Sequence, residues 1–374
     1  MLNCIVHFNK GCDFLKKLEN ENNKNVANEN TKKSKKVLRV ILKIFLIIFV
    51  SIIIFVLTTF LTALIYLNSK FGKIEFDNLT KTDVYIDNDV DKSLSDYRNI
   101  AILGIDARSD TFSRGNRSDC IMIVSINKKN KDIKIASVYR DTYLDIEGRG
   151  LDKVTHAYSF GEARLAINTL NRNLDLNISE YVAINFDTVR TAVDEVGGVT
   201  ITLDADEVKY INGYINALNK QFGTSSKNIT KPGTYNLDGV QALAYGRIRY
   251  TDGGDYKRTE RMRDVLLAVF DKAKKSDIAT LNNLLDTMLP HVRTNISKNN
   301  ILALIPSIAS YNVTDNFGWP YEVDGKIINK VWYGVPVNLE ANVSKLHKQL
   351  FNQDNYTPSA TVQTISNDIK EKTK

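Results

Sequence analysis

Hydrophobic residues along this chain fall into one long run followed by a series of short ones. The long run, residues 44–69, contains no charged residue over 26 positions, and about 20 apolar residues suffice to cross a bilayer as a helix. Six cations precede it, namely Lys32, Lys33, Lys35, Lys36, Arg39 and Lys43. By the positive-inside rule, the N-terminus is predicted to be cytoplasmic and the chain after about Lys70 extracytoplasmic.

A cleaved signal peptide and a buried core helix are the alternatives for this run. It is too long for the apolar region of a signal peptide, and no small-residue cleavage site follows at Tyr66-Leu67-Asn68. Residues 19–36 have almost no apolar content, which predicts disorder. The expected organisation is a cytoplasmic basic segment (1–37), a transmembrane helix (38–68), a connector (69–97), an extracytoplasmic domain (98–352) and a polar, disordered tail (353–374).

The short apolar runs predict a layered domain outside the membrane. Strands are expected at 99–105, 120–126, 133–138, 181–186 and 199–203, with a late edge strand at 331–335 before Pro336. The polar turn 127–131 makes the second and third strands a hairpin. Helices are expected at 161–173, 187–196, 240–244 (capped by Asn236 or Asp238), 257–274, 276–288, 299–310 and 340–350. This alternation indicates an α/β or α+β domain whose helices flank a mostly buried sheet.

Composition and lone reactive residues add little to this picture. The net charge of +7 is spread over the chain and does not by itself indicate nucleic-acid binding. Cys120 is the only thiol expected outside the membrane, where it opens an apolar run and is predicted to be buried. His156 could act as a general base, but a lone histidine is more often structural. The sequence has no Walker loop, nicotinamide fingerprint, G-x-S-x-G elbow or zinc-ligand spacing.

Charged pairs occur where the predicted strands begin and end. They are Asp106 and Arg108 after the first strand, Arg117 and Asp119 before the second, and Arg140 and Asp141 after the third. Because the second and third strands form a hairpin, these groups converge on one rim of the sheet if the first strand is their neighbour. Local ion pairing is the simpler interpretation of any single pair. The repetition favours a phosphoryl-transfer site, in which two carboxylates and phosphate oxygens would bind Mg²⁺.

A second basic segment, RIRYTDGGDYKRTERMR, follows at residues 247–263. It contains five arginines, Arg247, Arg249, Arg258, Arg261 and Arg263. Arginine suits two-point contacts with phosphate oxygens. Arg258, Arg261 and Met262 should share one face of the predicted helix, while Arg263 points away. The first two arginines share a face if they lie on extended chain, and Gly253-Gly254 allows a tight turn between the two groups. Outside the membrane, the expected phosphate is lipid-linked.

The motifs ILGIDAR, RSD, YRDTY, DKVTHAY, NFDTVRTAVDEVGGV and LDGVQALAYGRIRYTDGGDYKRTERMR occur in this order over about residues 98–270. In order and spacing they resemble the LytR-CpsA-Psr family, and the single N-terminal span also fits. The resemblance implies an α/β/α layered domain with a central mixed sheet. It implies an extracytoplasmic phosphotransferase that uses Mg²⁺, or Mn²⁺, to move a glycopolymer from a polyprenyl diphosphate to peptidoglycan. The usual acceptor in that family is the muramic acid 6-hydroxyl, and polyprenyl phosphate is released.

The resemblance also implies roles for individual residues. Asp106 and Asp119 match the magnesium-binding aspartates. The matches to the diphosphate-binding arginines are Arg108, Arg117, Arg140, Arg247, Arg249 and Arg258, with Arg261 a lesser candidate. Asp141 and Asp255 lie in the same motifs without a settled role, and our hypothesis is that Asp119 or Asp141 deprotonates the acceptor. Tyr139 and Met262 depart from the proline and glutamine that the family commonly has there.

Two other functions would use the same site. A polyprenyl-diphosphate phosphohydrolase would take water as its acceptor, and a wall-polymer or lipid sensor would bind the ligand without turnover. The expected partners are the polyprenyl-diphosphate-linked glycopolymer, peptidoglycan and membrane lipid, with no nucleic acid. The sequence does not identify the glycopolymer, which could be teichoic acid, capsule or another phosphate-bearing polysaccharide. Usage rich in Lys, Asn and Ile suggests a low-GC bacterium, and together with the resemblance it implies a Gram-positive one.

Overall fold

The computed structural model describes residues 36, 43, 45–63, 65–106, 112–185, 188–304 and 310–374. The chain divides into two compact units, residues 1–69 and 70–374. One helix among the described residues, Phe45–Phe71, is long and apolar enough to cross a membrane. It coincides with the greater part of the predicted span. The predicted cytoplasmic segment, 1–37, lies outside the described residues except for Lys36.

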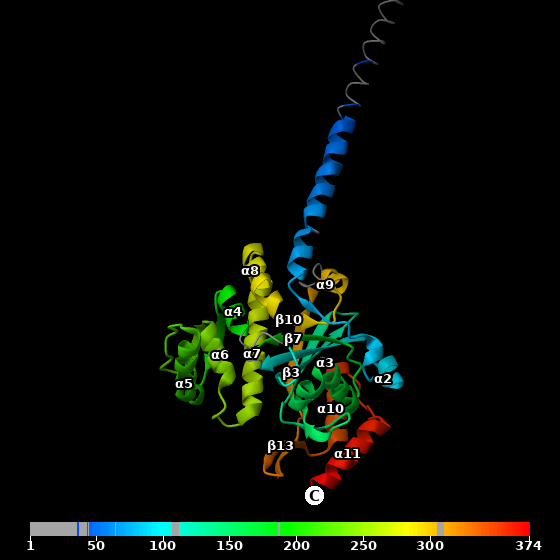
Figure 1. Cartoon of the computed structure of the whole chain (residues 1–374), viewed down its shortest axis with the longest axis vertical. Helices are drawn as coiled ribbons and strands as arrows, with labels where there is room; N and C mark the ends of the chain where they lie inside the picture. The colour runs from blue at the N-terminus through cyan, green and yellow to red at the C-terminus, as the bar shows by residue number, and fades with distance from the viewer. Residues whose placement is uncertain are drawn as a thin grey trace, which may run out of the picture. The chain divides into compact units, whose positions relative to one another are not determined.

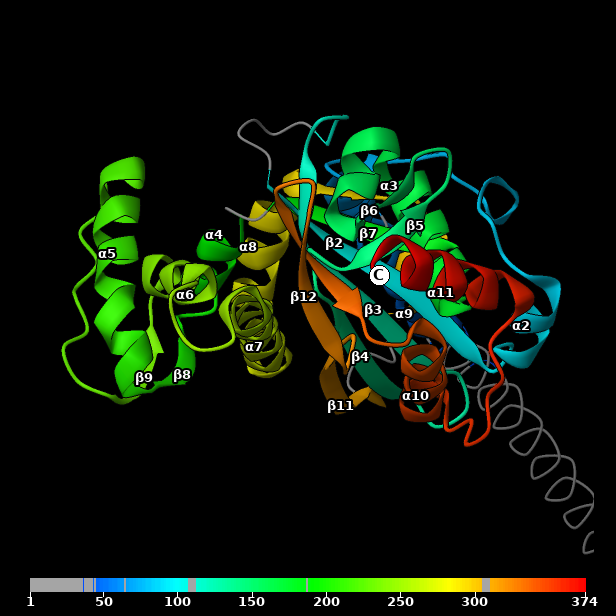
Figure 2. The ribbon, with the colours of Figure 1, turned by 90° about the horizontal axis from the view of Figure 1, so that it is seen from below.

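A seven-stranded mixed sheet forms the centre of the second unit (Figure 1, Figure 2). Its order is β1 (Glu75–Phe76), β10 (Val292–Thr294), β7 (Glu180–Asn185), β2 (Tyr97–Asp106), β3 (Arg117–Asn127), β4 (Asp132–Val138) and β11 (Asn312–Trp319). The pairs β1–β10, β7–β2 and β4–β11 are parallel, and the other three pairs are antiparallel. The predicted strands at 99–105, 120–126, 133–138 and 181–186 and the β3–β4 hairpin are confirmed.

Alternate side chains of the central strands enter two different cores. Ile121 and Ile123 of β3 pack in one core with α3 (Val154–Leu174), α10 (Leu339–Phe351) and α11 (Ala360–Lys372). Cys120 and Met122 pack in another with Met262 of α7 (Gly254–Lys275). Successive strand residues point to opposite faces, so a sheet covered on both faces needs continuous apolar runs. This arrangement confirms the predicted α/β/α layers.

A helical lobe with its own core lies beside α7 (Figure 2). It contains α4 (Thr188–Glu195), α5 (Ala205–Phe222), α6 (Gly239–Arg247) and the two-stranded sheet of β8 (Val199–Leu203) and β9 (Gly233–Leu237). Asp238 caps α6 by accepting a hydrogen bond from the Gln241 backbone N–H, as expected, whereas Asn236 belongs to β9. Val265 of α7 is buried in this same core, so α7 packs against the lobe.

The remaining elements are short and lie outside the central sheet. Two small sheets are β5 (Tyr143–Ile146) with β6 (Gly150–Lys153), and β12 (Val323–Ile328) with β13 (Val331–Pro336). The helices are η1 (Lys81–Asp83), α2 (Asn88–Ser93), α8 (Ile278–Met288), η2 (Leu289–His291) and α9 (Lys298–Leu304). β13 confirms the predicted late edge strand, which ends at Pro336. Residues 305–309 of the helix predicted at 299–310 lie outside the described part.

Two predicted segment assignments are wrong at the ends of the domain. The tail, 353–374, was expected to be disordered, but α11 buries Val362, Ile365 and Ile369 in the main core. The connector, 69–97, contributes β1 to the sheet and Val90 and Leu94 to the core. In both segments a few apolar residues at helical or strand spacing are enough to dock a polar stretch. The compact unit is therefore 70–374 rather than 98–352.

Candidate active site

The start of β3 carries a β-bulge that sets the position of Asp119. Gly104 pairs with Cys120 and Ile105 pairs with Ser118, so Asp119 is an extra residue without a partner across the strand pair. Such a bulge bends the strand and changes the direction of a side chain. Asp106, the last residue of β2, lies opposite Arg117, the first residue of β3. The backbone thus brings two of the predicted charged groups to one edge of the sheet.

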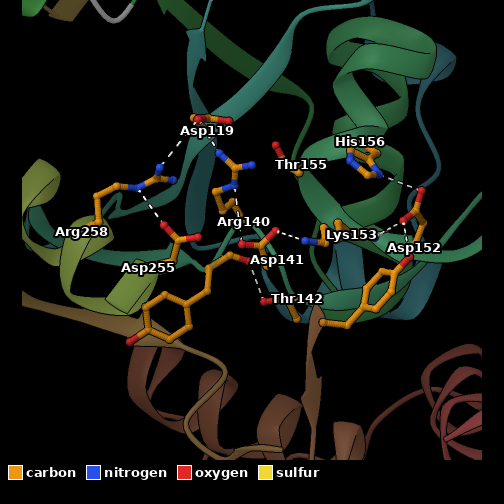
Figure 3. A network of polar contacts seen from close by, with 12 residues as sticks. Asp119, Arg140, Asp141, Thr142, Asp152, Lys153, Thr155, His156, Asp255 and Arg258 are labelled. Carbon is orange, nitrogen blue, oxygen red and sulfur yellow. Dashed lines mark hydrogen bonds and ion pairs between the residues drawn. The ribbon is translucent and has the colours of Figure 1, made fainter. Parts of the chain in front are cut away.

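Asp119 faces two guanidinium groups (Figure 3). Its Oδ2 lies 2.5 Å from Arg140 Nη1 and 3.9 Å from Arg258 Nη1. Its Oδ1 is buried and has no hydrogen-bond partner among the described residues. Because a buried carboxylate oxygen is normally satisfied, Oδ1 is the oxygen free to meet a ligand at this edge.

A second carboxylate, Asp141, lies beside the first pair (Figure 3). Its Oδ1 is 2.7 Å from Lys153 Nζ, and its Oδ2 is 3.7 Å from Arg140 Nε. Burial raises the pKa of Asp141, but hydrogen bonds with Asp255 and Lys153 and the nearby positive charges outweigh it. The pKa of Asp141 consequently lies below its ordinary value. Lys153 was not among the predicted site residues, although it lies inside the motif DKVTHAY directly after Asp152; its contact with Asp141, twelve residues away, depends on the fold.

The second basic segment surrounds a cavity of about 380 Å³ beside Asp119. Its lining residues are Asp119, Tyr214, Gly246, Arg247, Arg249, Tyr250, Arg258 and Met262. The turn between the two arginine groups has Gly253 at φ 86° and Gly254 at φ 47°, backbone angles that favour glycine, as predicted. Arg247 is the last residue of α6, so the condition that it share an extended segment with Arg249 is not met. Both nevertheless line the cavity.

Arg258 is the most deeply buried arginine of this cavity, at 3% exposure. Burial lowers its pKa, and the carboxylates of Asp255 and Asp119 partly offset that effect. Its Nε lies 3.3 Å from Asp255 Oδ1, which also lies 3.6 Å from Arg249 Nε. Neither Nε nor Nη2 of Arg258 makes a hydrogen bond of good geometry to the described residues. A buried cation with unmade hydrogen bonds is costly unless an anion completes it.

Arg261 and Arg263 do not join this cluster. Arg261, also 3% exposed, binds Glu207 of α5 at 2.7 Å and donates to Ile248 O and Thr251 Oγ1. Arg263 donates to Ser137 Oγ at 3.2 Å, on the sheet side of α7, as its predicted direction implies. Of the predicted helix face, only Arg258 and Met262 line the cavity. The partners of Arg261 are therefore structural elements.

Three predicted site residues are not among the side chains that the structure places in this cluster. Arg108 and the side chain of Asp106 lie outside the described residues. Arg117 begins β3 and is exposed at the sheet edge. The structure thus brings together Asp119, Arg140, Asp141, Asp255 and Arg258 directly, with Arg247 and Arg249 around the adjoining cavity.

Comparison with known proteins agrees with this geometry. A family model described as the LytR_cpsA_psr family matches residues 61–350. The chain belongs to the LytR-CpsA-Psr family. It is 35% identical over 233 residues, 60% of this chain and 69% of the other, to the polyisoprenyl-teichoic acid–peptidoglycan teichoic acid transferase TagT of Bacillus subtilis. It is 32% identical over 254 residues, 65% and 72% of the two chains, to the corresponding transferase TagU of Oceanobacillus iheyensis.

Solved structures of this family share the fold. A structure of TagT bound to LI-WTA aligns with a TM-score of 0.57 at 29% identity, over 75% of this chain and 98% of that one. A structure of TagT with bound octaprenyl pyrophosphate lipid aligns with a TM-score of 0.53 at 26% identity, over the same shares, 75% and 98%. The second unit of this family member is therefore a LytR-CpsA-Psr domain.

The carboxylates of this family member fit a magnesium site of the kind that a substrate completes. Among the described residues, no group of three or more His, Cys, Asp or Glu side chains is arranged for a metal. Mg²⁺ commonly takes only one or two protein carboxylates and fills its other positions with water and phosphate oxygens. Asp119 Oδ1 meets the requirement for such a ligand, since it is buried without a hydrogen-bond partner among the described residues while Arg140 holds the other oxygen. Asp106 ends the neighbouring strand within the same edge.

Of the weaker candidates, Cys120 and His156 have structural surroundings, and the apolar cavity beside α7 is very small. Cys120 is 1% exposed, and burial raises its pKa to about 12, so it is the buried residue that was predicted. His156 Nδ1, on the first turn of α3, lies 2.8 Å from Asp152 Oδ2 of the preceding strand β6, a local hydrogen-bond contact. The apolar helical segments 240–245 and 265–270 are normally core, but one of them could instead line a slot for a lipid chain. The second supplies Leu266 of α7 to an apolar cavity of only about 10 Å³ against β2 and β3. That cavity is too small for an acyl or prenyl chain.

Proposed function

We propose that this chain is a membrane-anchored extracytoplasmic phosphotransferase with a phosphate-bearing glycopolymer as its cargo. It takes the glycopolymer from a polyprenyl-diphosphate carrier and joins it to peptidoglycan, at the muramic acid 6-hydroxyl, through a phosphodiester. The observation that carries the proposal is the buried guanidinium of Arg258, whose Nε and Nη2 make no hydrogen bond of good geometry to the described residues and which lines a cavity together with Arg247 and Arg249. The names of the relatives, which are transferases of teichoic acid to peptidoglycan, support the same reaction class.

The diphosphate of the donor occupies the arginine cavity in this proposal. A volume of about 380 Å³ suits a small anionic group together with its first sugar. Three arginines around it would neutralise the charge that is shared over the phosphate oxygens during transfer. Arg117 and Arg140 extend this positive edge along β3 and β4. The predicted contributions of Arg108 and Arg261 remain predictions.

Asp106 and Asp119 would hold the Mg²⁺ ion. When bound, the ion would polarise a phosphate oxygen as a Lewis acid. Arg140 contributes by fixing Asp119 Oδ2, which leaves Oδ1 directed to the ion. The bulge at Asp119 provides a rigid position for that oxygen, because the flanking residues Ser118 and Cys120 are both buried in the sheet.

Asp141 is the carboxylate that we assign to proton removal, with Asp119 as the alternative. Its lowered pKa keeps it ionised at neutral pH, and Lys153 and Arg140 fix its two oxygens. The acceptor hydroxyl gives its proton to this carboxylate as its oxygen bonds to the glycopolymer-linked phosphorus. The bond from that phosphorus to the bridging oxygen breaks, and polyprenyl phosphate leaves with the electron pair.

The test uses the full chain in detergent with Mg²⁺, a polyprenyl-diphosphate sugar donor and peptidoglycan oligomers, read by mass spectrometry. A sugar joined to the glycan through a phosphodiester, absent with Asp106→Ala, is the expected product. Free sugar phosphate with unmodified glycan would instead identify a phosphohydrolase. Tight donor binding without cleavage of several donors would identify a sensor. Transfer that survives Asp106→Ala would rule out Asp106 as an essential metal ligand.

A further inference from the structure

An exposed aromatic side chain stands on the β12–β13 hairpin, next to the candidate active site. Trp332 of β13 is 40% exposed, and its cross-strand partner, Ile327 of β12, is 75% exposed. The hairpin forms a separate two-stranded sheet, so this apolar pair belongs to none of the protein's cores. Contiguous exposed apolar residues beside a polar site commonly mark a binding surface.

Two glycines give this face of the hairpin a flat floor. Gly325 and Gly334 are cross-strand partners. A Cβ at Gly325 would lie 3.0 Å from Trp332 Nε1, and a Cβ at Gly334 would lie 2.9 Å from the hydroxyl oxygen of Tyr256. The indole therefore lies over one glycine, and the Tyr256 ring contacts the other. The two ring centroids are 6.3 Å apart.

The β12–β13 hairpin is hydrogen bonded directly to the backbone of the candidate active site. The Gly334 N–H donates to the Asp141 backbone carbonyl at 2.9 Å, and Trp332 lies two residues from Gly334, about 6.6 Å along the strand. Tyr256 directly follows Asp255 on α7. Its ring is also 4.3 Å from that of Tyr139, which precedes Arg140. An aromatic row thus begins at the residues that hold the carboxylates and ends in solvent at Trp332.

The row and the phosphate cavity occupy different flanks of α7. Tyr256 and Arg258 are two positions apart, which is about 200° around a helix. Arg258 lines the arginine cavity, whereas Tyr256 contacts the hairpin. Asp255, which directly precedes Tyr256, contacts Arg258 on one side and lies next to Asp141 on the other. A group bound on the aromatic row would therefore meet the carboxylates from the side away from the diphosphate.

We propose that Trp332 and Tyr256 form a subsite for a pyranose ring of the acceptor glycan, which rests on the proposed function. A pyranose presents a face of C–H groups, which is attracted to the negative face of an aromatic ring while the hydroxyls remain hydrated. The hairpin contributes Gly325, Ile327, Trp332 and Gly334 to this face, whereas Asp324 and Lys326 alternate with them and point to the other one, where they pair at 3.6 Å. A neutral sugar therefore fits it better than a phosphate. The acceptor also has to approach opposite the leaving group, as the arrangement provides.

The chain's own fluorescence tests binding without turnover. It has two tryptophans, and Trp319 is fully buried, so ligand-induced changes in emission report on Trp332. The full chain in detergent is titrated with a soluble oligosaccharide of alternating N-acetylglucosamine and N-acetylmuramic acid that carries no phosphate. A saturating change in emission that Trp332→Ala abolishes is expected. Ile278→Ala, which removes an exposed apolar side chain of α8, should leave the titration unchanged. No change in the unaltered chain overturns the subsite.

Steady-state kinetics separates the acceptor from the donor. Trp332→Ala should raise the KM for the acceptor about tenfold and leave the KM for the donor and kcat unchanged. Trp332→Phe, which keeps a ring, should restore most of the affinity. If the donor KM rises instead, the row binds donor sugar and the assignment to the acceptor is wrong. If glycan binding depends on Trp332 but no phosphodiester forms with any donor, the proposed function fails while the subsite stands.

Discussion

Arg258 and Arg261 show how two arginines on one helix can have opposite purposes. Each is 3% exposed, and they are three residues apart on α7. Arg261 has an ion pair and two hydrogen bonds of good geometry, whereas Arg258 has only the longer ion pairs with Asp255 and Asp119, and its Nε and Nη2 make no hydrogen bond of good geometry to the described residues. A buried charge whose hydrogen bonds are all made within the protein is part of the folded structure. A buried charge with unmade hydrogen bonds costs stability, and an anionic ligand can complete it. Sequence spacing could not distinguish them, because both partners come from distant segments.

These contacts predict opposite outcomes for the same substitution. Arg258→Met should change the melting temperature little and lower kcat/KM by about 100-fold or more, because its two carboxylate partners, Asp119 and Asp255, keep Arg140 and Arg249 as partners while the contact with substrate is lost. Arg261→Met should lower the stability by about 3–5 kcal/mol, because Glu207 is left buried without its partner. Thermal unfolding and single-turnover assays on both variants would check this. A strongly destabilised Arg258→Met would show that Arg258 is structural instead.

Asp264 gives a pH prediction of known sign. Burial raises its pKa, and the carboxylates of Glu260 and Glu207 add to the effect of burial. A raised folded-state pKa means that this group favours the folded state most below its unfolded pKa, and that this contribution is lost as pH rises through the folded pKa. Asp264→Asn should therefore raise the melting temperature at pH 7, by about 1–3 °C, and change it little near pH 3.

A second aspartate provides the matched control for this pH effect. Hydrogen bonds with Thr280 lower the pKa of Asp277, the N-cap of α8. Its contribution is therefore present above the unfolded pKa and is lost as pH falls. Asp277→Ala should lower the melting temperature at pH 7. Equal responses of the two variants at pH 7 and pH 3 would contradict both assignments.

At the scale of elements, the spacing of apolar residues predicted the central strands of the sheet but not the strands near its edges. β2, β3 and β4 are covered by helices on both faces, so their sequences are continuous apolar runs that predict strands. β11 alternates exposed polar residues with half-buried ones, and β1 and β10 are only two and three residues long, so their sequences carry little signal. α5 was missed although its capping box at Asp204 and Glu207 and the spacing of Ile211, Ile215 and Leu218 were readable.

The C-terminal tail was wrongly predicted to be disordered, and the packing of α11 predicts how much this helix contributes to the free energy of unfolding. Val362, Ile365 and Ile369 are buried at i, i+3 and i+7 in an otherwise polar helix. Full burial of such side chains stabilises by about 1.5–3 kcal/mol each, so removal of residues 353–374 should cost about 4.5–9 kcal/mol. Denaturant unfolding of the truncated chain would measure the loss. Asp368→Ala, on the exposed face of α11, should be nearly neutral, and a truncation that is equally neutral would show that the helix is dispensable.

For the whole molecule, the site depends on long-range register rather than on any one motif. The bulge that isolates Asp119 requires the pairing of β2 with β3, and the contact of Asp141 with Lys153 requires β4 and the start of α3 to meet. The sequence could predict which charged groups converge, because they lie at element boundaries. It could not predict the pairing within the group, such as the separate partners of Arg258 and Arg261, since these depend on how α5 and α7 pack.

The division into two units leads to a prediction about the membrane helix. The core, the arginine cavity and the carboxylates all lie within residues 70–374, so this fragment should fold with the melting temperature of the full chain. It should process a water-soluble, short-chain donor at the same kcat/KM. With a long-chain donor in vesicles, the full chain should be faster by about 100-fold, because anchoring raises the effective concentration of enzyme and lipid on one surface. Equal rates of the two proteins on vesicles would show that the helix does not bring the site to its donor, whereas a fragment that is slow on both donors would show that residues before 70 complete the site.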